Sequence, residues 1–359
     1  MAIAIPYLFG RAESFEKSRA RLGLESFCRK DIAQMRPFFF GNFFLAFLVY
    51  LCYNKVEIFT FEEALMKLYA PAYYKHFKCI ADACVHSCCV GWEIDIDERT
   101  LEKYKELKNS YAPAIMESIS QEDTPHFRLC ADDRCPHLDE RGLCKIILNV
   151  GEEYLSHICR EHPRFYNFTS VAEVGVGMSC PEAARLILSS TDFSLMEEVG
   201  EVDAEADGVL FDGRAERTNV YDILQENDYA SALAQVYCAY SIDLGEDDRW
   251  LPILASLEYL NADHKELFLQ YMSSRRPAGE EVEEYCKRFL AYFIYRHCTE
   301  AIDSEDFCVR LSFCLFCERL FASLICSQGA QTLQEIAMLA SIISEEIEYS
   351  DDNTWALMG

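Results

Sequence analysis

The sequence is poor in basic residues. Its 359 residues include 33 Lys and Arg against 60 Asp and Glu, which gives a formal net charge of −27. A surface of this sign repels the phosphate backbone, so nucleic acid is excluded as an expected partner. The same charge attracts cationic partners and raises their rate of encounter.

The chain also lacks a secretion signal. No N-terminal stretch combines a charged region, a short apolar core and a small-residue cleavage site in that order. We therefore expect a cytoplasmic protein whose thiols stay reduced. Because 51% of the residues are hydrophobic, a packed core is expected, and the length allows two domains.

Charge is absent from residues 37–53, which read PFFFGNFFLAFLVYLCY. A stretch of this length is at the short end for a membrane span. Arg36 and Lys55 flank it, so the flanking charges give no orientation. Three interpretations are open: a membrane anchor, a buried or interfacial helix, or a segment outside the native protein. A membrane is a partner only if residues 37–53 are a genuine anchor.

The composition of residues 1–65 favours the third interpretation. They hold eight Lys/Arg and seven Asp/Glu, a net charge of +1, so the remainder carries −28. The sequence from Met66, MKLYAP, resembles a natural start, and Glu62-Glu63-Ala64 can be encoded by a purine-rich ribosome-binding element. We therefore expect residues 1–65 to be an extension that arises from a start codon assigned too early, or a hydrophobic anchor.

Cysteine, in contrast, is abundant. Nine of the 18 cysteines fall between positions 79 and 180, and Cys79, Cys84, Cys88 and Cys89 follow the spacing C-x4-C-x3-C-C. Gaps of two to four residues place sulfurs around one metal centre, and clustered reduced thiols are more often metal ligands than disulfides. Core packing explains scattered cysteines well but explains turn-associated ones poorly. His86, inside the loop, is either a further ligand or a solvent-exposed turn residue.

The pattern after this loop predicts short, mixed elements. Asp97 is placed to cap a following helix, and Pro113 marks a break or a new helix start. The expected elements are a strand over 92–97, an amphipathic helix over 98–119, a short helix over 151–160, a hairpin of 165–169 with 174–178, and a helix opened by Cys180-Pro181.

Helical periodicity dominates the second half. Residues 189–212 are acidic and show little periodicity, so 191–220 is predicted to be an acidic linker. Successive helices are expected over 221–244, 250–260, 264–272, 280–302, 305–327 and 332–348. Cys314 and Cys317 match CxxC, but they lie in an apolar helix, which favours buried packing.

These patterns predict a mainly α protein. A cysteine-rich metal- or cluster-binding domain with short β-hairpins covers 66–190. The acidic linker covers 191–220, and a helical domain, a bundle, covers 221–359.

The order of the motifs carries a family likeness. YYKHFKC ends at Cys79, and GWEIDID, CPHL, GLCKI, CREHPRFY and SCPEAARLIL follow the C-x4-C-x3-C-C loop. Together they resemble the bacterial flagellin lysine-N-methylase family, whose front half is related to zinc- or iron-chelating domains with a CxxCxxxCC pattern. The likeness spans about 66–190 and continues weakly at 289–297 and 346–353.

The resemblance implies methyl transfer from S-adenosylmethionine to lysine side chains of flagellin, with a [4Fe–4S] cluster, or zinc as the alternative, held by cysteines. The family-like cysteines are Cys79, Cys84, Cys88, Cys89, Cys135, Cys144, Cys159 and Cys180. Cys130 is peculiar to this chain. Eight thiols exceed the four that one cluster needs, so either a second site, for instance zinc, exists or several thiols are structural.

Methylation of lysine requires loss of its proton, because the ordinary pKa of the side chain is about 10.4. Candidate bases or orienting groups lie at Glu152 and Glu153, and chiefly at Glu161, His162 and Tyr166. Arg160 and Arg164 suit the carboxylate of S-adenosylmethionine, since planar bidentate pairing favours Arg. Salt bridges to acidic neighbours are the alternative role for both arginines.

Two cofactor-binding motifs are absent. Gly175 and Gly177 supply only two of the three glycines of a nucleotide-binding loop, and they fit the predicted hairpin instead. The radical S-adenosylmethionine spacing CxxxCxxC does not occur, because Cys89 directly follows Cys88. The rival hypothesis is a non-enzymatic metal-chelating module whose helical half binds a partner.

Overall fold

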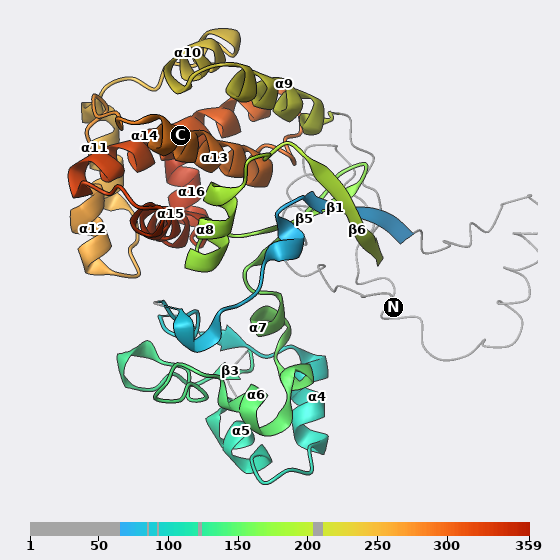
Figure 1. Cartoon of the computed structure of the whole chain (residues 1–359). Helices are drawn as coiled ribbons and strands as arrows, with labels where there is room; N and C mark the ends of the chain where they lie inside the picture. The colour runs from blue at the N-terminus through green and yellow to red at the C-terminus, as the bar shows by residue number, and fades with distance from the viewer. Residues whose placement is uncertain (1–64, 85, 92, 121–123, 204–210) are drawn as a thin grey trace, which may run out of the picture. The chain divides into compact units, whose positions relative to one another are not determined.

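The computed structural model describes residues 65–359, apart from 85, 92, 121–123 and 204–210 (Figure 1). The predictions for 1–65, including the three interpretations of 37–53, therefore lie outside the described residues. Among the described residues, no helix combines the length and apolar character that crossing a bilayer requires.

Residues 77–161, here called the cysteine lobe, are built from short elements. Asp97 caps α4 by accepting a hydrogen bond from the Thr100 amide, 3.0 Å away, and Pro113 lies in the first turn of α5. Both predictions are confirmed. The elements are η2 (Ala81–Ala83), β2 (Ile94–Asp95), α4 (Glu98–Glu106), α5 (Ala112–Ser118), β3 (His126–Phe127), η3 (Ala131–Asp133), α6 (Lys145–Val150), η4 (Glu152–Tyr154) and α7 (His157–Glu161).

The predicted helix over 151–160 is wrong in detail. The chain forms η4 and then α7, because the Ser156 hydroxyl accepts from the Cys159 amide and starts a new helix. The cysteine lobe has its own small core, separate from that of the helices. Its buried members are Ile94, Ile96, Tyr104, Ile115, Ile119, Phe127, Cys135, Leu138 and Ile146.

A four-stranded sheet follows the order β4-β5-β1-β6. Its strands are β1 (Leu65–Pro71), β4 (Arg164–Phe168), β5 (Ala172–Val176) and β6 (Met196–Asp203), and η1 (Tyr74–His76) follows β1. The predicted hairpin is confirmed, since β4 and β5 pair antiparallel with Phe165 opposite Gly175. A Cβ on Gly175 would lie 2.3 Å from the Phe165 ring, so this glycine serves close packing.

The prediction of a linker over 191–220 is wrong for its described part. Met196–Asp203 forms β6, an edge strand of the sheet, and α9 begins at Gly213. Lysines outside the segment offset its acidic charge: Lys67 pairs with Glu198 at 2.8 Å and Lys75 with Glu197 at 2.9 Å. Sequence periodicity missed the strand because only Val202 on it is buried. The domain boundaries at 66, 190 and 220 stay predictions.

The C-terminal half is helical, so the mainly α prediction is confirmed. The predicted helix over 221–244 is interrupted where the Asp228 carboxylate accepts from the Ser231 amide and starts α10. α16 was not predicted. The helices are α8 (Pro181–Ser189), α9 (Gly213–Glu226), α10 (Tyr229–Ala239), α11 (Asp247–Ser256), α12 (Ala262–Phe268), α13 (Glu280–His297), α14 (Ser304–Gln328), α15 (Leu333–Glu348) and α16 (Asp351–Met358).

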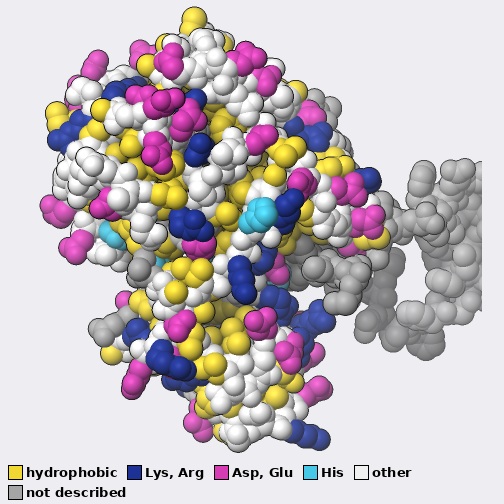
Figure 2. Space-filling view, viewed as in Figure 1, with side chains coloured by type: hydrophobic (Ala, Val, Ile, Leu, Met, Phe, Trp, Pro, Cys, Tyr) yellow, Lys and Arg dark blue, Asp and Glu magenta, His cyan; other side chains and the backbone are white. Residues whose placement is uncertain are grey.

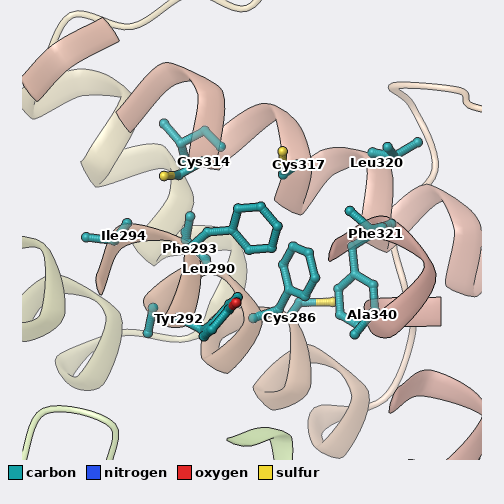
Figure 3. Packing of buried hydrophobic residues seen from close by; sticks show 14 of the residues in the cluster. Cys286, Leu290, Tyr292, Phe293, Ile294, Cys314, Cys317, Leu320, Phe321 and Ala340 are labelled. Carbon is teal, nitrogen blue, oxygen red and sulfur yellow. The ribbon is translucent and has the colours of Figure 1, made fainter. Parts of the chain in front are cut away.

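The main core lies around α13 and α14, which pack along each other, while α15 packs against α8. Figure 3 shows Cys314 and Cys317 of α14 among the buried side chains of this core, close to Phe293 and Leu290 of α13. Both cysteines are fully buried, which confirms that the CxxC spacing in α14 reflects packing.

One buried ion pair ties the sheet to the helices. Arg217 of α9 donates to both carboxylate oxygens of Glu173 on β5, at 2.7 and 2.8 Å, and to the Thr299 hydroxyl at 2.6 Å. Both charged side chains are nearly inaccessible. The bidentate geometry and the third hydrogen bond offset the cost of burying the two charges.

Charge of one sign does not gather in one place on the face shown in Figure 2. Acidic side chains are spread over that surface with basic ones among them. The strong net negative charge is therefore distributed on this face rather than concentrated in a single patch.

Candidate functional site

The cysteine loop begins in a tight turn. Ala81 has a φ of +51°, and its amide donates to the Cys79 sulfur at 3.4 Å. Cys79 and Cys88 are exposed, whereas Cys84 and Cys89 are partly buried. Cys89 donates a hydrogen bond to Cys88, which lowers the pKa of Cys88 and raises that of Cys89. The adjacent thiols at 88 and 89 are thus in contact and differ in acidity.

Three later cysteines lie around the core of the cysteine lobe. The Cys135 amide donates to the Cys89 carbonyl at 2.8 Å, and Leu138 forms an isolated antiparallel bridge with Cys144. Cys159, on α7, packs against the same core. Burial raises the pKa of Cys135 to about 11 and that of Cys159 to about 12, and neighbouring thiols add to both shifts.

Cys180 belongs to different surroundings. It is the N-terminal capping position of α8 and packs against the main core of the helices. Burial raises its pKa to about 11, and the charges that add to this shift are those of Cys84 and Cys88. Cys180 is therefore a neighbour of the loop at 84–88, although about 90 residues separate them in the sequence.

The donor chemistry of these cysteines suits a soft metal or an iron–sulfur cluster. All sixteen cysteines in the described part are reduced. Within that part, no three Cys, His, Asp or Glu side chains stand together closely enough to hold an ion as they are placed. The residue types therefore fit a thiolate centre, but ligation requires side chains to turn towards one another. The ligand role of the eight predicted cysteines stays a prediction.

The two arginines predicted to bind the cofactor have protein partners. Arg160 donates to the Leu155 carbonyl at 2.7 Å. Arg164 donates to the Tyr74 hydroxyl at 3.0 Å and to the Arg160 carbonyl at 3.3 Å. Neither guanidinium forms an ion pair with a described carboxylate, so the salt-bridge alternative is not observed within these residues. Binding of a cofactor carboxylate by either arginine stays a prediction.

Two of the three predicted catalytic residues form a pair. The Tyr166 hydroxyl donates to the Glu161 carboxylate at 3.0 Å. Burial, followed by the charge of Glu161, raises the pKa of Tyr166. Tyr166 therefore stays protonated at neutral pH and serves as a donor rather than a base. Of the other predicted bases, Glu152 and Glu153 lie on η4 in the cysteine lobe, where the Glu153 carbonyl accepts from Lys103.

His162, the third predicted catalytic residue, has a different environment. It ends α7, and its ring centroid is 6.3 Å from that of Tyr349, which follows α15. Burial lowers the pKa of His162 to about 4, and the positive charges of His86 and Arg296 contribute. The imidazole is therefore neutral at physiological pH and can accept a hydrogen bond through one ring nitrogen.

A polar cluster around Arg296 brings distant segments together. Arg296 of α13 pairs with Glu348 of α15 at 3.2 Å and donates to the Tyr292 hydroxyl at 3.0 Å. Its guanidinium lies over the rings of Phe165 and Tyr349, at 4.8 and 5.8 Å from their centroids. We call Arg296, Glu348, Tyr292, His297 and Tyr349 the Arg296 cluster.

Glu348 is the centre of this cluster. Its fully buried carboxylate accepts from His297 at 2.7 Å, from Tyr292 at 3.0 Å and from Ser344. Burial alone would raise the pKa of Glu348, but Arg296 and the hydrogen bond from His297 outweigh it and lower the pKa. The carboxylate is therefore ionised and compensates the charge of Arg296.

The turn before α8 connects the cluster to Cys180. The Tyr292 hydroxyl accepts from the Met178 amide at 3.0 Å, and Ser179 donates to the Tyr349 hydroxyl at 3.0 Å. A Cβ on Gly177 would lie 2.9 Å from Nη1 of Arg296, so only glycine allows this approach without displacement. Cys180 directly follows this turn in the sequence.

His86 connects the cysteine loop to the same helix. Its Nε2 lies 3.3 Å from the Glu345 carboxylate on α15, and hydrogen bonding to Glu345 raises the pKa of His86. The side chain is only one-third exposed, which differs from the solvent-exposed turn residue considered above. The loop that carries Cys84 and Cys88 is therefore anchored one turn before Glu348.

Sequence reasoning placed Arg296 and His297 in a weakly family-like segment but missed Glu345, Glu348 and Tyr349 as site residues. Glu348 and Tyr349 lie in the tail segment 346–353, which also belongs to the resemblance. The signal that could have found them was the likeness of this tail. The structure brings three family-like segments, around 162, 179 and 296, to that tail.

Comparison with known proteins found no matching family model and no matching solved structure. A lysine-N-methylase of Salmonella choleraesuis (strain SC-B67) is 30% identical over 136 residues, which are 36% of this chain and 34% of that protein. The lysine-N-methylase of Salmonella typhimurium (strain LT2) is 29% identical over 136 residues, with the same shares. The matched part thus spans about a third of the length of these two relatives.

A shorter relative is covered more fully. The flagellar biosynthetic protein FliU of Salmonella muenchen is 30% identical over 136 residues, which are 36% of this chain and 80% of FliU.

Proposed function

Because this chain belongs to the family of the lysine-N-methylases and FliU, we propose that it transfers methyl groups from S-adenosylmethionine to lysine side chains of flagellin. The observation that carries the proposal is the convergence of the family-like segments on the Arg296 cluster, next to Cys180 and the anchored cysteine loop. A polar, largely buried cluster of titratable groups beside thiols is the kind of place where chemistry is performed.

The electrostatics of the site suit a cationic substrate and a cationic methyl donor. Arg296 carries a positive charge there, and Glu348 compensates it. His162 adds no charge at neutral pH because its pKa is about 4. Glu345 of α15 lies 3.3 Å from His86 and offsets the charge that this imidazole carries when protonated. Repulsion of a lysine ammonium or a sulfonium is therefore small.

The lysine must become a neutral amine before it can attack the methyl group. Transfer into a buried site lowers the pKa of a lysine, because the charged form loses its hydration. A neutral His162 can then accept a hydrogen bond from the amine and orient its lone pair towards the methyl carbon. The bond from sulfur to the methyl group breaks as the bond from nitrogen forms, and the proton leaves to solvent.

The cysteines next to the cluster, chiefly Cys84, Cys88 and Cys180, would hold the iron–sulfur centre that this proposal includes. When bound, such a cluster supplies iron that can take a non-cysteine ligand, such as a group of the cofactor. The protein residues supply orientation: Ser179 fixes the Tyr349 hydroxyl, and Glu345 fixes the loop through His86.

Co-expression with flagellin tests this proposal. We expect flagellin lysines to gain the mass of methyl groups when the wild-type chain is present, and His162→Ala to reduce this by at least about tenfold. Arg141→Ala is the matched control, since Arg141 is exposed and its guanidinium pairs with Asp139 in the cysteine lobe. Unchanged lysine masses with a folded wild-type chain and S-adenosylmethionine present would reject the proposal for that flagellin.

A second candidate is a metal-binding module without enzymatic activity. The separate core of the cysteine lobe favours it, because a lobe with its own core and thiols can serve as a unit. This candidate predicts that flagellin masses stay unchanged and that the Arg296 cluster tolerates substitution. Arg296→Met decides between the two candidates if the variant remains folded and metal-loaded but loses methylation.

A further inference from the structure

Some polar side-chain atoms are buried among the helices without a hydrogen-bond partner. Among the described residues, these atoms are the hydroxyls of Tyr237 and Tyr271, Nη1 of Arg275 and Nε of Arg319. Tyr237 belongs to α10 and Arg319 to α14, while Tyr271 and Arg275 lie in the segment between α12 and α13. Buried polar atoms are nearly always paired in folded proteins, so these atoms require an explanation.

Three of these side chains lie close together. Burial raises the pKa of Tyr237 and that of Tyr271, and Arg319 at close range opposes both rises. Tyr237 in turn adds to the rise at Tyr271. The Tyr271 ring packs edge-on against Phe316 of α14, one turn before Arg319, with the ring centroids 5.7 Å apart. The two hydroxyls and the guanidinium therefore share one small region.

The segment that carries Tyr271 is held in place by backbone hydrogen bonds. The Met272 amide donates to the hydroxyl of a serine on α14 at 2.9 Å, and the Ser273 amide donates to a carboxylate on α11 at 2.7 Å. Tyr271 itself is 1% exposed, whereas Tyr237 and Arg319 are half-buried. The region is therefore preorganised at the edge of the main core, where solvent partly reaches it.

The unpartnered groups supply donors but lack an acceptor. Nη1 of Arg319 already donates to the Gly245 carbonyl at 2.9 Å, and a guanidinium accepts no hydrogen bond. If Arg319 turned to donate to both tyrosine oxygens, the hydroxyl protons would still need an acceptor. One tyrosine can donate to the other, but the proton of the second hydroxyl then remains unpaired.

The positive charge of this region has no ion-pair partner within the described part. Arg275, Arg276 and Arg319 form no salt bridge there, and Arg276 donates to two carbonyls of its own segment. Neighbouring carboxylates have other donors: Asp247 accepts from a backbone amide, and Glu318 accepts from a tyrosine of α10. In a chain with a net charge of −27, this group of arginines is unusual.

We propose that Tyr237, Tyr271 and Arg319 bind a tetrahedral oxyanion that carries no proton, either sulfate or the dianion of a phosphate monoester. Such an ion offers only acceptors, and its charge compensates the guanidinium. A water molecule accepts at most two hydrogen bonds and brings no charge, and a carboxylate has only two oxygens. The site is separate from the Arg296 cluster and the cysteine lobe, so it does not depend on methyl transfer.

Titration calorimetry of the full chain tests the binding. The probes are sodium sulfate and glycerol phosphate at about pH 8, where a phosphate monoester is a dianion. We expect saturable binding of one ion per chain, with the tighter probe identifying the source, and binding of acetate at least about tenfold weaker. The double variant Tyr237→Phe with Tyr271→Phe should bind at least about tenfold more weakly, because two hydrogen bonds to a charged group are lost. Absence of saturation with both probes, or unchanged affinity of the double variant, would overturn the proposal.

Stability without ligand gives a second test, because an unpartnered buried hydroxyl costs free energy. In a buffer free of oxyanions, Tyr271→Phe should unfold at the same temperature as wild type or at a higher one. Tyr221→Phe is the matched control, since Tyr221 is also buried but its hydroxyl donates to the Ala291 carbonyl at 2.8 Å. This control should unfold at a lower temperature and keep the wild-type affinity for the ion. If Tyr271→Phe lost as much stability as Tyr221→Phe, the Tyr271 hydroxyl would have an acceptor within the protein, and the proposal would be wrong.

Discussion

At the scale of single residues, Glu318 shows how burial shifts the pKa of a carboxyl group. Its carboxylate accepts a hydrogen bond from Tyr229 inside the main core, and burial raises its pKa from 4.5 to about 7. The folded-state pKa is thus above the unfolded value. The carboxyl group therefore lowers the free energy of unfolding as pH rises through this interval, because ionisation is easier in the unfolded chain.

Replacing Glu318 by Gln should remove this pH dependence. The amide oxygen can still accept from Tyr229, and it carries no charge at any pH. Between about pH 5 and about pH 8, the unfolding free energy of wild type should fall relative to Glu318→Gln by up to about 3 kcal/mol. Denaturant unfolding of both proteins at several pH values measures this difference. A difference that does not change with pH would show that Glu318 keeps an ordinary pKa.

Single residues also show how far sequence reasoning reaches. Asp97, Pro113 and Cys317 were predicted correctly, because capping, first-turn proline and an apolar helix are local signals. Glu348 was missed as a site residue, because its role depends on Arg296 and His297 from another helix. Pairings between side chains far apart in the sequence leave no periodic pattern.

At the scale of elements, α15 is the one on which the site depends most. It carries both Glu345, which anchors the cysteine loop, and Glu348, the centre of the Arg296 cluster. A capping box starts this helix: the Thr332 hydroxyl accepts from the Glu335 amide, and the Glu335 carboxylate accepts from the Thr332 amide at 3.0 Å. The start of α15, and part of the stability of this helix, therefore depend on Thr332.

Thr332→Ala should destabilise the protein by about 1 kcal/mol, since it leaves an amide of the first turn without its side-chain acceptor. Thr332→Ser is the matched control, because it keeps the capping oxygen. Thermal unfolding of the two variants measures the effect. The idea that the box fixes α15 fails if the alanine and serine variants have the same stability.

Two elements of the structure also show where sequence periodicity gave a wrong prediction. The apolar stretch over 221–244 predicted one helix, but Asp228 offers a better local cap and starts a second. The acidic stretch before it forms β6, because pairing with a neighbouring strand and two lysines compensates for weak apolar alternation. Sheet pairing is a long-range interaction, so the local composition of an edge strand predicts it poorly.

At the scale of the whole molecule, the described chain contains two cores of unequal size. The core of the cysteine lobe is small, whereas the helices bury a far larger set of aromatic and aliphatic side chains. Regions with few buried apolar contacts open at lower free energy than the rest of a structure. We therefore expect the cysteine lobe to open while the helices remain folded.

Ile115→Ala tests this expectation, because Ile115 is fully buried in the core of the cysteine lobe. Loss of its side chain should cost about 2–5 kcal/mol locally. In hydrogen exchange, amides of β2, β3 and α4 should lose protection, while those of α13 and α14 keep theirs. Phe316→Ala, in the main core, is the comparison and should lower protection throughout the helices. If Ile115→Ala lowered protection in α13 and α14 as much as in α4, the two cores would unfold as one cooperative unit, and independent opening of the cysteine lobe would be ruled out.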